Sequence, residues 1–286
     1  MPGPTSHSYF SQRLRLHYLD WGNPTAPPLL LVHGNRDHAH NWDWTAERLQ
    51  DRYHIIAPDL RGHGDSQWST GSMYAPAEFV YDIAQLVHQQ QLAPLRIVAH
   101  SLGGNIALRY AGIYPEAVER LVVIEGWGGM LPSHHQPNPP ERMRGWIDTQ
   151  RSLAARQPRR YVTLDEAFRR MLEANPHLST SQARHLTVHG ANQNEDGTYS
   201  WKFDNYTHAS QVLDLPADDV RKLWRNIACP VLLLAGSESW IRSGGDPTAL
   251  VGEFADAQHV VVDEAGHWVQ HDQLDVFLEL LDDFLS

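Results

Sequence analysis

The sequence predicts an α/β protein in which helices cover both faces of a mostly parallel, doubly wound sheet. Six short segments are almost continuously apolar, which is typical of strands buried on both faces of a parallel sheet. They are residues 27–34, 54–59, 95–100, 120–126, 229–236 and 258–266. Helical patterns separate these segments, and alternation of this kind indicates a doubly wound sheet.

Two of the intervening segments show apolar residues at helical spacing. The first set is Phe79, Val80, Ile83, Leu86 and Val87, and the second is Phe277, Leu280, Leu281 and Phe284. We expect Asp272 to be the N-cap of the second helix. Residues 14–22 alternate apolar and polar side chains, which predicts an antiparallel strand at the sheet edge.

One long stretch interrupts the alternation. Residues 127–226 contain a proline-rich loop and several helical patterns but no convincing buried strand. We therefore expect a helical cap (lid) inserted after the sixth strand, with residues 1–126 and 227–286 forming the core.

Local signals inside this region predict two smaller features. Ser179 and Gln182 have capping-box spacing, and the helix that they begin is expected to end at Gly190. Residues 194–204 combine turn residues with alternating aromatic side chains, which favours a small hairpin.

Composition and charge exclude several classes of protein. The chain has 286 residues, with 23 Lys and Arg against 34 Asp and Glu, and its net charge of −11 would repel a phosphate backbone. No apolar run is long enough to cross a bilayer, and the first ten residues lack the features of a signal peptide. We expect a cytoplasmic protein that acts on a small molecule, without nucleic-acid binding or membrane insertion; a homodimer is left open.

The 18 histidines raise the question of a metal site. His38 and His40 form one cluster, and His134 and His135 form another. Neither cluster has the helical spacing or the carboxylate and thiolate neighbours of a recognisable zinc motif. We therefore interpret them as solvated surface histidines and expect neither a metal nor another cofactor.

The segment RIVAHSLGGNIALRYA, residues 96–111, begins as a strand and ends as a helix, with Ser101 at the turn. Ala99 and Gly103, two residues to either side, are small enough to let strand and helix approach closely. A serine at the carboxyl edge of a parallel sheet faces the crevice where ligands bind, and there it is a candidate nucleophile. The backbone N–H of Leu102, at the helix N-terminus, would stabilise a developing negative charge. The pattern is that of a G-x-S-x-G nucleophile elbow with alanine in place of the first glycine.

Three further motifs, LLLVHG, APDLRGHGDS and EAGHW, occur around this elbow in the order typical of the α/β-hydrolase superfamily. Over nearly its full length the chain therefore resembles this superfamily, in its capped, esterase-like branch. The resemblance implies an α/β-hydrolase fold and a catalytic triad. His267, which follows the last strand through a tight turn, is the expected base, with His271 a weaker candidate. The oxyanion hole is expected to use the backbone N–H groups of Asn35, in the HGN loop, and Leu102.

The acidic member of the triad departs from the usual family pattern. The family most often carries an Asp three or four residues beyond the position of Gly236, where this chain has Ser239 and Trp240. The same loop offers only Glu238, which lies one or two positions early.

A subgroup of haloalkane dehalogenases, whose HGN loop this chain shares, carries its acid as a Glu at the end of the preceding strand. This chain has Glu125 at the matching position. The dehalogenase nucleophile is an Asp and not a serine, so the resemblance supplies an acid position but not their reaction. We favour Glu125 over Glu238, with Asp263 or no acid at all as further alternatives.

Aromatic residues are expected to line an apolar substrate pocket, with Trp127 and Trp146 from the cap and Trp268 beside the expected base. These features predict a serine hydrolase, a carboxylesterase acting on small to medium hydrophobic esters through an acyl-enzyme. C–C bond hydrolysis or cofactor-free perhydrolysis on the same triad is the alternative chemistry. A non-catalytic small-molecule-binding homologue is the alternative of another class.

Overall fold

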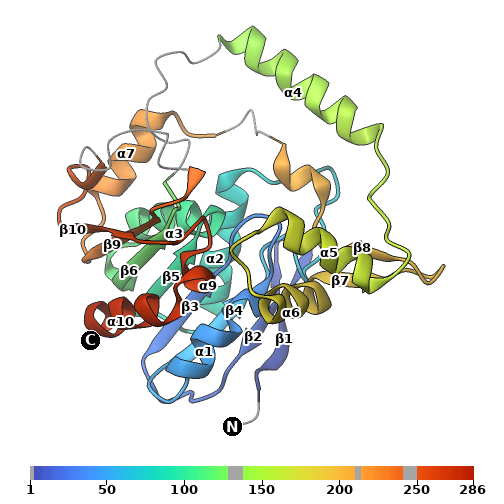
Figure 1. Ribbon diagram of the computed structural model, residues 1–286. Coiled ribbons are helices and arrows are strands. Elements are labelled where there is room, and N and C mark those ends of the chain that lie inside the picture. Colours follow the sequence, from blue (N-terminus) through green and yellow to red (C-terminus); the bar gives the residue numbers. More distant parts are fainter. Residues whose placement is uncertain (1–2, 128–137, 210–213, 241–249) are drawn as a thin grey trace.

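The structure is a computed structural model that describes residues 3–127, 138–209, 214–240 and 250–286 (Figure 1). It contains an eight-stranded sheet in the order β1-β2-β4-β3-β5-β6-β9-β10. All pairs from β4 to β10 are parallel, and the pairs β1–β2 and β2–β4 are antiparallel. The predicted mostly parallel sheet is therefore confirmed. The strands are β1 (Thr5–Ser11), β2 (Leu14–Asp20), β3 (Pro28–Val32), β4 (His54–Pro58), β5 (Leu95–His100), β6 (Val118–Ile124), β9 (Val231–Gly236) and β10 (Ala257–Val262).

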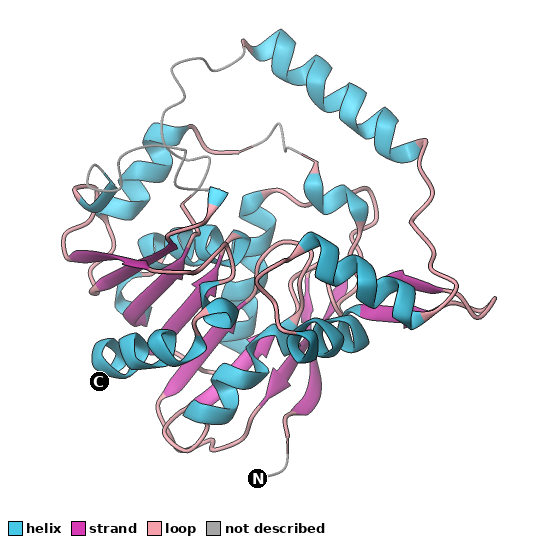
Figure 2. Cartoon of the chain, viewed as in Figure 1, coloured by secondary structure: helices cyan, strands magenta, loops and turns pink. Residues whose placement is uncertain are grey.

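The central strands are continuously apolar because helices cover both faces of the sheet (Figure 2). Leu29 and Leu31 pack on one face, with α1 and α10, while Leu30 and Val32 pack on the other, with α2, α3 and α7. The helices are α1 (Asp43–Leu49), α2 (Pro76–Gln89), α3 (Leu102–Ile113), α7 (Ala217–Arg225) and α10 (Leu274–Leu285). Successive side chains of a strand point to opposite faces, so a strand between two helical layers needs apolar residues at every position.

The two edges of the sheet differ from the sequence prediction. Residues 14–22 do not form the edge: β2 pairs with β1 on one side and with β4 on the other. The edge strand β1 was missed because only Tyr9 and Ser11 of its residues are buried, which leaves a weak apolar pattern. At the opposite edge, β10 ends at Val262 and is only partly buried, whereas residues 258–266 were expected to be buried on both faces.

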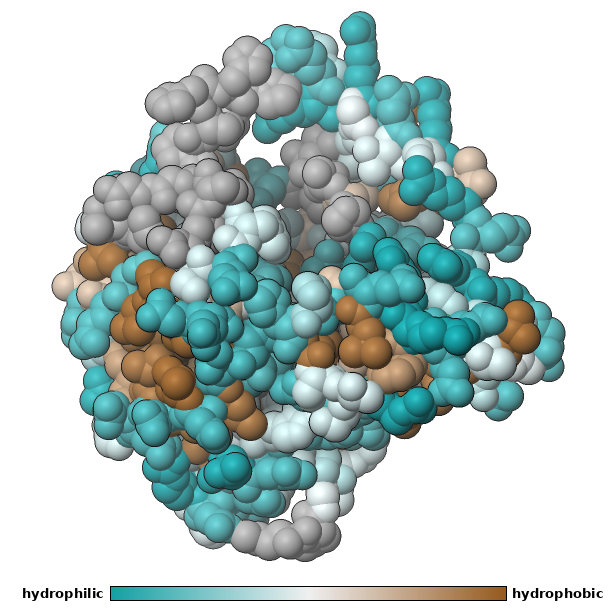
Figure 3. All heavy atoms as spheres, in the orientation of Figure 1, coloured by the Kyte–Doolittle hydropathy of each residue, from teal (hydrophilic) through white to brown (hydrophobic). Residues whose placement is uncertain are grey.

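The surface in Figure 3 is mostly hydrophilic, with hydrophobic atoms gathered over the region of β10 and α10. Val261 on β10 and Val276 on α10 are both exposed. Within the part of the chain that the structure describes, no helix combines the length and the apolar character that crossing a bilayer requires.

The helix-end predictions have different outcomes. Ser179 and Gln182 form the expected capping box, and the helix ends at Gly190 as expected. Asp272 is not the N-cap of α10, because it belongs to the short preceding helix α9 (Val269–Asp272), and the N-cap is Gln273. The Asp272 carboxylate instead accepts a hydrogen bond from the Gly266 N–H at 2.8 Å.

Helices and a hairpin lie between β6 and β9, which we call the β6–β9 insertion (Figure 1). Its elements are α4 (Pro139–Ala154), α5 (Leu164–Ala174), α6 (Thr180–Gly190), β7 (Ala191–Gln193), β8 (Tyr199–Trp201), η3 (Asn205–His208) and α7. A hairpin is present as the antiparallel pair β7–β8, but its first strand lies before the predicted range of 194–204. Helix α7 packs on α3, where Trp224 is fully buried, so this last helix of the predicted cap range contributes to the layer that covers the sheet.

Candidate active site

Ser101 stands at the turn between β5 and α3 with a strained backbone, φ 51° and ψ −115°. The turn is tight because α3 begins directly against the end of β3. A Cβ added at Gly103 would lie 2.5 Å from the carbonyl oxygen of Val32, which is backbone and cannot move aside. Glycine at this position therefore lets the helix start close enough to hold Ser101 at the edge of the sheet.

Glu125 follows β6, the strand next to β5, also at positive φ (52°), and its side chain is fully buried. The Nδ1–H of His267 donates to its Oε2 at 2.6 Å. The Gly236 N–H donates to Oε1 at 2.9 Å, and the Ser239 hydroxyl donates to Oε2. Three donors therefore hold the carboxylate in place. Since Nδ1 of His267 donates to the carboxylate, Nε2 is left as the proton acceptor.

The other candidate acids and the second candidate base lie elsewhere. Glu238 is half exposed, and its carboxylate lies 3.6 Å from Nε2 of His177. Asp263 is exposed. His271 is buried between Trp44 and Trp268.

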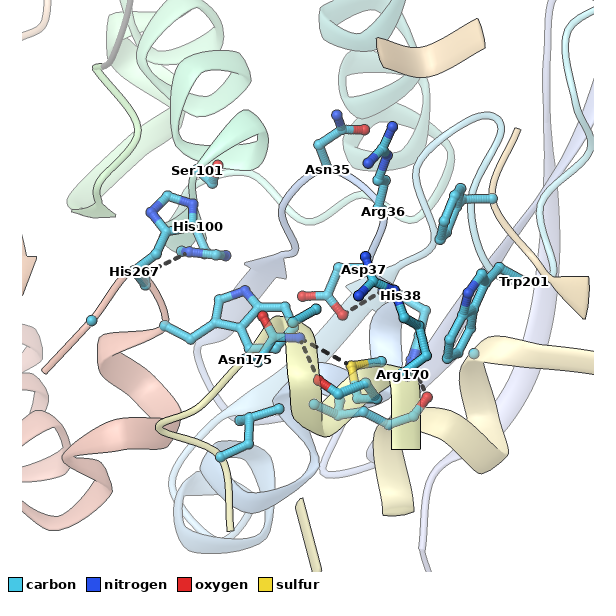
Figure 4. A pocket seen from close by; sticks show the side chains of 18 of the residues that line it. Asn35, Arg36, Asp37, His38, His100, Ser101, Arg170, Asn175, Trp201 and His267 are labelled. Atoms are coloured by element: carbon cyan, nitrogen blue, oxygen red, sulfur yellow. Dashed lines mark hydrogen bonds between the residues drawn. The ribbon is translucent and has the colours of Figure 1, made fainter. Parts of the chain in front are cut away.

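Ser101 and His267 both line one cavity of about 630 Å³. Figure 4 shows them together with His100 at one end of it. The His100 ring lies 4.7 Å from the His267 ring, and its Nε2–H donates to the His267 carbonyl at 2.9 Å. Burial, reinforced by the nearby His267, holds the pKa of His100 well below its usual value, so His100 is a neutral support for the His267 backbone. Among the described residues, the Ser101 hydroxyl makes no hydrogen bond, which leaves it open to a ligand.

The segments that carry the two expected oxyanion donors, the loop after β3 and the start of α3, both adjoin Ser101. The loop after β3 passes so close that a Cβ at Gly34 would lie 3.1 Å from Cβ of Ser101. Asn35 follows and lines the cavity, and its side-chain oxygen lies 3.1 Å from Nε2 of His63. Leu102 is the first residue of α3, so its N–H has no partner within the helix.

Buried polar residues brace the loop after β3. The Leu60 N–H donates to Nε2 of His33 at 3.0 Å, and burial lowers the pKa of His33 to about 3, so this ring remains a neutral acceptor. Asp59 accepts hydrogen bonds from His17 and from the backbone N–H of Ala39 and Asp65. Burial alone would raise its pKa, but the His17 contact holds that pKa well below its usual value. His33 and Asp59 thus support the backbone around this loop.

Aromatic and basic side chains share the rest of the cavity wall. The aromatic residues are Tyr161, Trp201, Phe203, Trp240 and Trp268, and the basic residues are Arg36, Arg159, Arg170 and Lys202. Figure 4 shows Arg170 and Trp201 at the end away from Ser101. The basic residues were not predicted, because they come from separate loops and helices that only the fold brings to one cavity.

Of the three predicted pocket tryptophans, only Trp268 lines this cavity. The prediction is wrong for Trp127, which is 5% exposed and packs in the apolar cluster of α3 and α7, with its ring 5.8 Å from His259. It is also wrong for Trp146, which lies on α4, a helix that buries none of its residues and contributes none to the cavity wall.

Asp37 is a buried acid in the cavity wall that the sequence analysis missed. Its carboxylate accepts hydrogen bonds from the His38 N–H, at 2.9 Å, and from the Asn41 amide. Burial raises its pKa well above the usual value. Its position two residues after Asn35, in the loop expected to form the oxyanion hole, was the sequence signal that could have placed it in the cavity wall.

The interpretation of His38 and His40 as solvated surface residues is wrong. His38 is 5% exposed, and its Nε2–H donates to the Leu186 carbonyl of α6 at 3.0 Å. His40 is half-buried because its ring stacks on that of His189 on α6. His134 and His135 lie outside the described residues.

The sheet, the strained serine turn and the adjoining cavity define a hydrolase of the α/β class. Residues 27–274 match the family model described as alpha/beta hydrolase fold, and the chain belongs to this family.

Relatives and solved structures agree with that assignment. Esterase Rv0045c of Mycobacterium tuberculosis is 26% identical over 264 residues, covering 92% of this chain and 84% of the relative. A serine hydrolase-like protein of Danio rerio is 24% identical over 274 residues, covering 93% and 83%. The thioesterase domain from the curacin biosynthetic pathway has the same fold, with a TM-score of 0.85 at 21% identity over 99% of this chain and 100% of that one. E-2-(acetamidomethylene)succinate hydrolase has a TM-score of 0.79 at 21% identity over 99% of each chain.

Proposed function

We propose that this protein is a serine hydrolase that cleaves carboxylic esters through an acyl-enzyme, with Ser101, His267 and Glu125 as its triad. The observation that carries the proposal is the 2.6 Å hydrogen bond from Nδ1 of His267 to the buried Glu125. A carboxylate at Nδ1 orients the imidazole and stabilises its protonated form while Nε2 works as the base. Relatives named as an esterase and as a serine hydrolase-like protein support the same reaction class.

In the proposed reaction, Oγ of Ser101 attacks the ester carbonyl carbon while Nε2 of His267 takes the hydroxyl proton. The carbonyl oxygen becomes an oxyanion, which the backbone N–H groups of Asn35 and Leu102 stabilise. The tetrahedral intermediate expels the alcohol, which receives the proton from His267. Water then attacks the acyl-enzyme with His267 again as the base, and the carboxylic acid leaves as Ser101 regains its proton.

The side chains of the cavity wall indicate which kind of ester the site would accept. Trp201, Phe203 and Trp268 favour an apolar acyl or alcohol portion. Arg159 and Arg170, on the wall formed by the β6–β9 insertion, would tolerate a negative charge at the far end of such a substrate. We therefore propose small to medium esters that combine an apolar part with room for a distal polar or anionic group.

Hydrolysis of p-nitrophenyl acetate and butyrate tests the proposal, with Ser101→Ala as the matched variant. The wild-type enzyme should release p-nitrophenol, and a fluorophosphonate probe should label it, whereas Ser101→Ala should do neither. If the wild-type protein releases no p-nitrophenol and takes no label, while a small molecule still raises its melting temperature, a binding function replaces this proposal.

A further inference from the structure

A second group of polar side chains lies outside the cavity, where α6 meets the start of α1. His40 belongs to the short helix η1 (Ala39–Trp42), Asp43 is the first residue of α1, and His185 and His189 lie on α6. One nitrogen or oxygen atom from each of the four residues can be chosen so that all four atoms lie within 4.8 Å of one another. None of the four lines the cavity at Ser101.

Asp43 is the centre of this group, which we call the seam cluster (His40, Asp43, His185 and His189). Its Oδ2 lies 2.8 Å from Nδ1 of His40 and 2.9 Å from Nε2 of His185. Asp43 is 8% exposed, and its other oxygen, Oδ1, is buried with no hydrogen-bond partner among the described residues. A buried carboxylate oxygen without a donor is costly unless it binds something, such as a cation.

His189 completes the group from one helical turn beyond His185. Its ring stacks on that of His40 with a centroid distance of 3.7 Å and lies 4.5 Å from the ring of His185. Two histidines four residues apart lie on the same face of a helix, which is the usual way in which a helix offers two imidazoles to one ion. His40, His185 and His189 are each only partly buried, so an ion could reach them from solvent.

The chemistry of these four groups selects the kind of ion. Three imidazoles and one carboxylate suit zinc and neighbouring divalent transition metals, whereas calcium and magnesium prefer sites made of oxygen. Ligand atoms around a tetrahedral zinc lie about 3.3 Å apart at normal bond lengths. The four ligand atoms lie within 4.8 Å of one another, so side-chain shifts of about 1–2 Å would bring them to this spacing.

We propose that the seam cluster binds one divalent transition metal ion of the zinc class, which links α6 to the start of α1. Helix α6 contributes Leu186 and Gly190 to the cavity wall, and α1 follows the loop that carries Asn35. A metal at the seam therefore holds one wall of the cavity against the loop of the proposed oxyanion hole. The ion is not a participant in the hydrolytic reaction proposed above.

Binding of zinc alone to tag-free, chelator-treated protein tests the proposal. Equilibrium dialysis against zinc chloride should show one tightly held equivalent in the wild-type protein, and the melting temperature should rise with zinc. His185→Asn and His189→Asn should each weaken binding at least tenfold and lose the zinc-dependent rise. With cobalt(II) as the probe, the wild-type protein should show the intense visible absorption of a four-coordinate site, and both variants should lose it.

Two controls separate this site from other histidines. His88→Asn, at an exposed position on α2, and His267→Asn, at the proposed catalytic base, should both bind zinc like the wild-type protein. The proposal is overturned if His185→Asn and His189→Asn bind zinc as tightly as the wild-type protein, or if His267→Asn removes the tight equivalent. Because dialysis does not depend on ester hydrolysis, either result is independent of the proposed function.

Discussion

Glu125 Oε2 accepts a hydrogen bond from His267 Nδ1 at 2.6 Å, although the two residues are 142 positions apart in the chain. The contact is possible because β6 and β9 are parallel neighbours, with Ile124 paired to Leu234. Both strands end at the same edge of the sheet, so a carboxylate at the end of either strand can reach the same imidazole. In this chain the carboxylate that contacts His267 follows β6, and Ser239 in the loop after β9 donates to it.

Glu125→Gln should lower kcat for ester hydrolysis by about 10³- to 10⁴-fold, because the amide cannot orient and stabilise the His267 imidazolium. The side chain keeps its shape, but its N–H₂ group would face a donor that now meets a carboxylate oxygen, so the free energy of unfolding should fall by roughly 1–3 kcal/mol without loss of the fold. Steady-state kinetics on p-nitrophenyl butyrate measure the effect. Glu238→Gln is the matched control and should stay within a few-fold of the wild-type enzyme; a large loss in that variant with a small loss in Glu125→Gln would reverse the assignment.

Ser239 is a positioning residue, because its hydroxyl donates to the Glu125 carboxylate, which in turn accepts from His267. Ser239→Ala removes a hydrogen bond to a charged group, and we expect kcat to fall about tenfold with KM nearly unchanged. Ser239→Thr keeps the hydroxyl and should retain most of the activity. An equal loss of kcat in both variants would indicate a packing role instead.

Gly103→Ala should destabilise the protein by about 3 kcal/mol or more, because the new methyl group would meet the backbone oxygens of Val32 and His33 at 2.5 and 2.6 Å. Gly145→Ala is the control within a helix, since nothing lies within 4 Å of the added methyl group. That variant should be more stable by roughly 0.5–1 kcal/mol. Urea unfolding of both variants measures the difference, and similar midpoints would contradict the close approach of α3 and β3.

Acid should destabilise the protein through its buried histidines. Burial lowers the pKa of His271 to about 3, so the folded protein keeps this ring neutral while the unfolded chain protonates it below about pH 6.5. The unfolded state therefore binds more protons, and the free energy of unfolding falls as the pH drops from about 6.5 towards 3. At pH 5 this single residue should cost roughly 1–2 kcal/mol.

His271→Phe tests this linkage, since the replacement keeps a ring between Trp44 and Trp268 and removes the titration. The free energy of unfolding of this variant should depend less steeply on pH between 6.5 and 4 than that of the wild-type protein. His88→Phe, at an exposed position on α2, is the control and should keep the wild-type slope. An unchanged slope in His271→Phe would show that this ring is not kept neutral by burial.

Much of the fold follows from local sequence patterns. Three kinds of feature depend only on residues that are close together in the sequence. They are the apolar runs of β3, β5, β6 and β9, the helical spacing in α2 and α10, and the capping box at Ser179. Strand β1 was missed because it lies at the sheet edge, where solvent rather than a second layer covers most of its side chains.

The candidate site also has one feature that local sequence predicts and several that only the tertiary structure fixes. The sequence by itself determined the serine turn, because a tight strand-to-helix bend needs small residues at fixed positions around Ser101. Only the tertiary structure decided that the carboxylate of Glu125, and not that of Glu238, contacts His267, that Trp127 is in the core, and that His40 lies against His185 and His189. These contacts join residues that are far apart in the chain. They are fixed by the register of neighbouring strands and by the packing of α6 on α1, and no local sequence pattern encodes either.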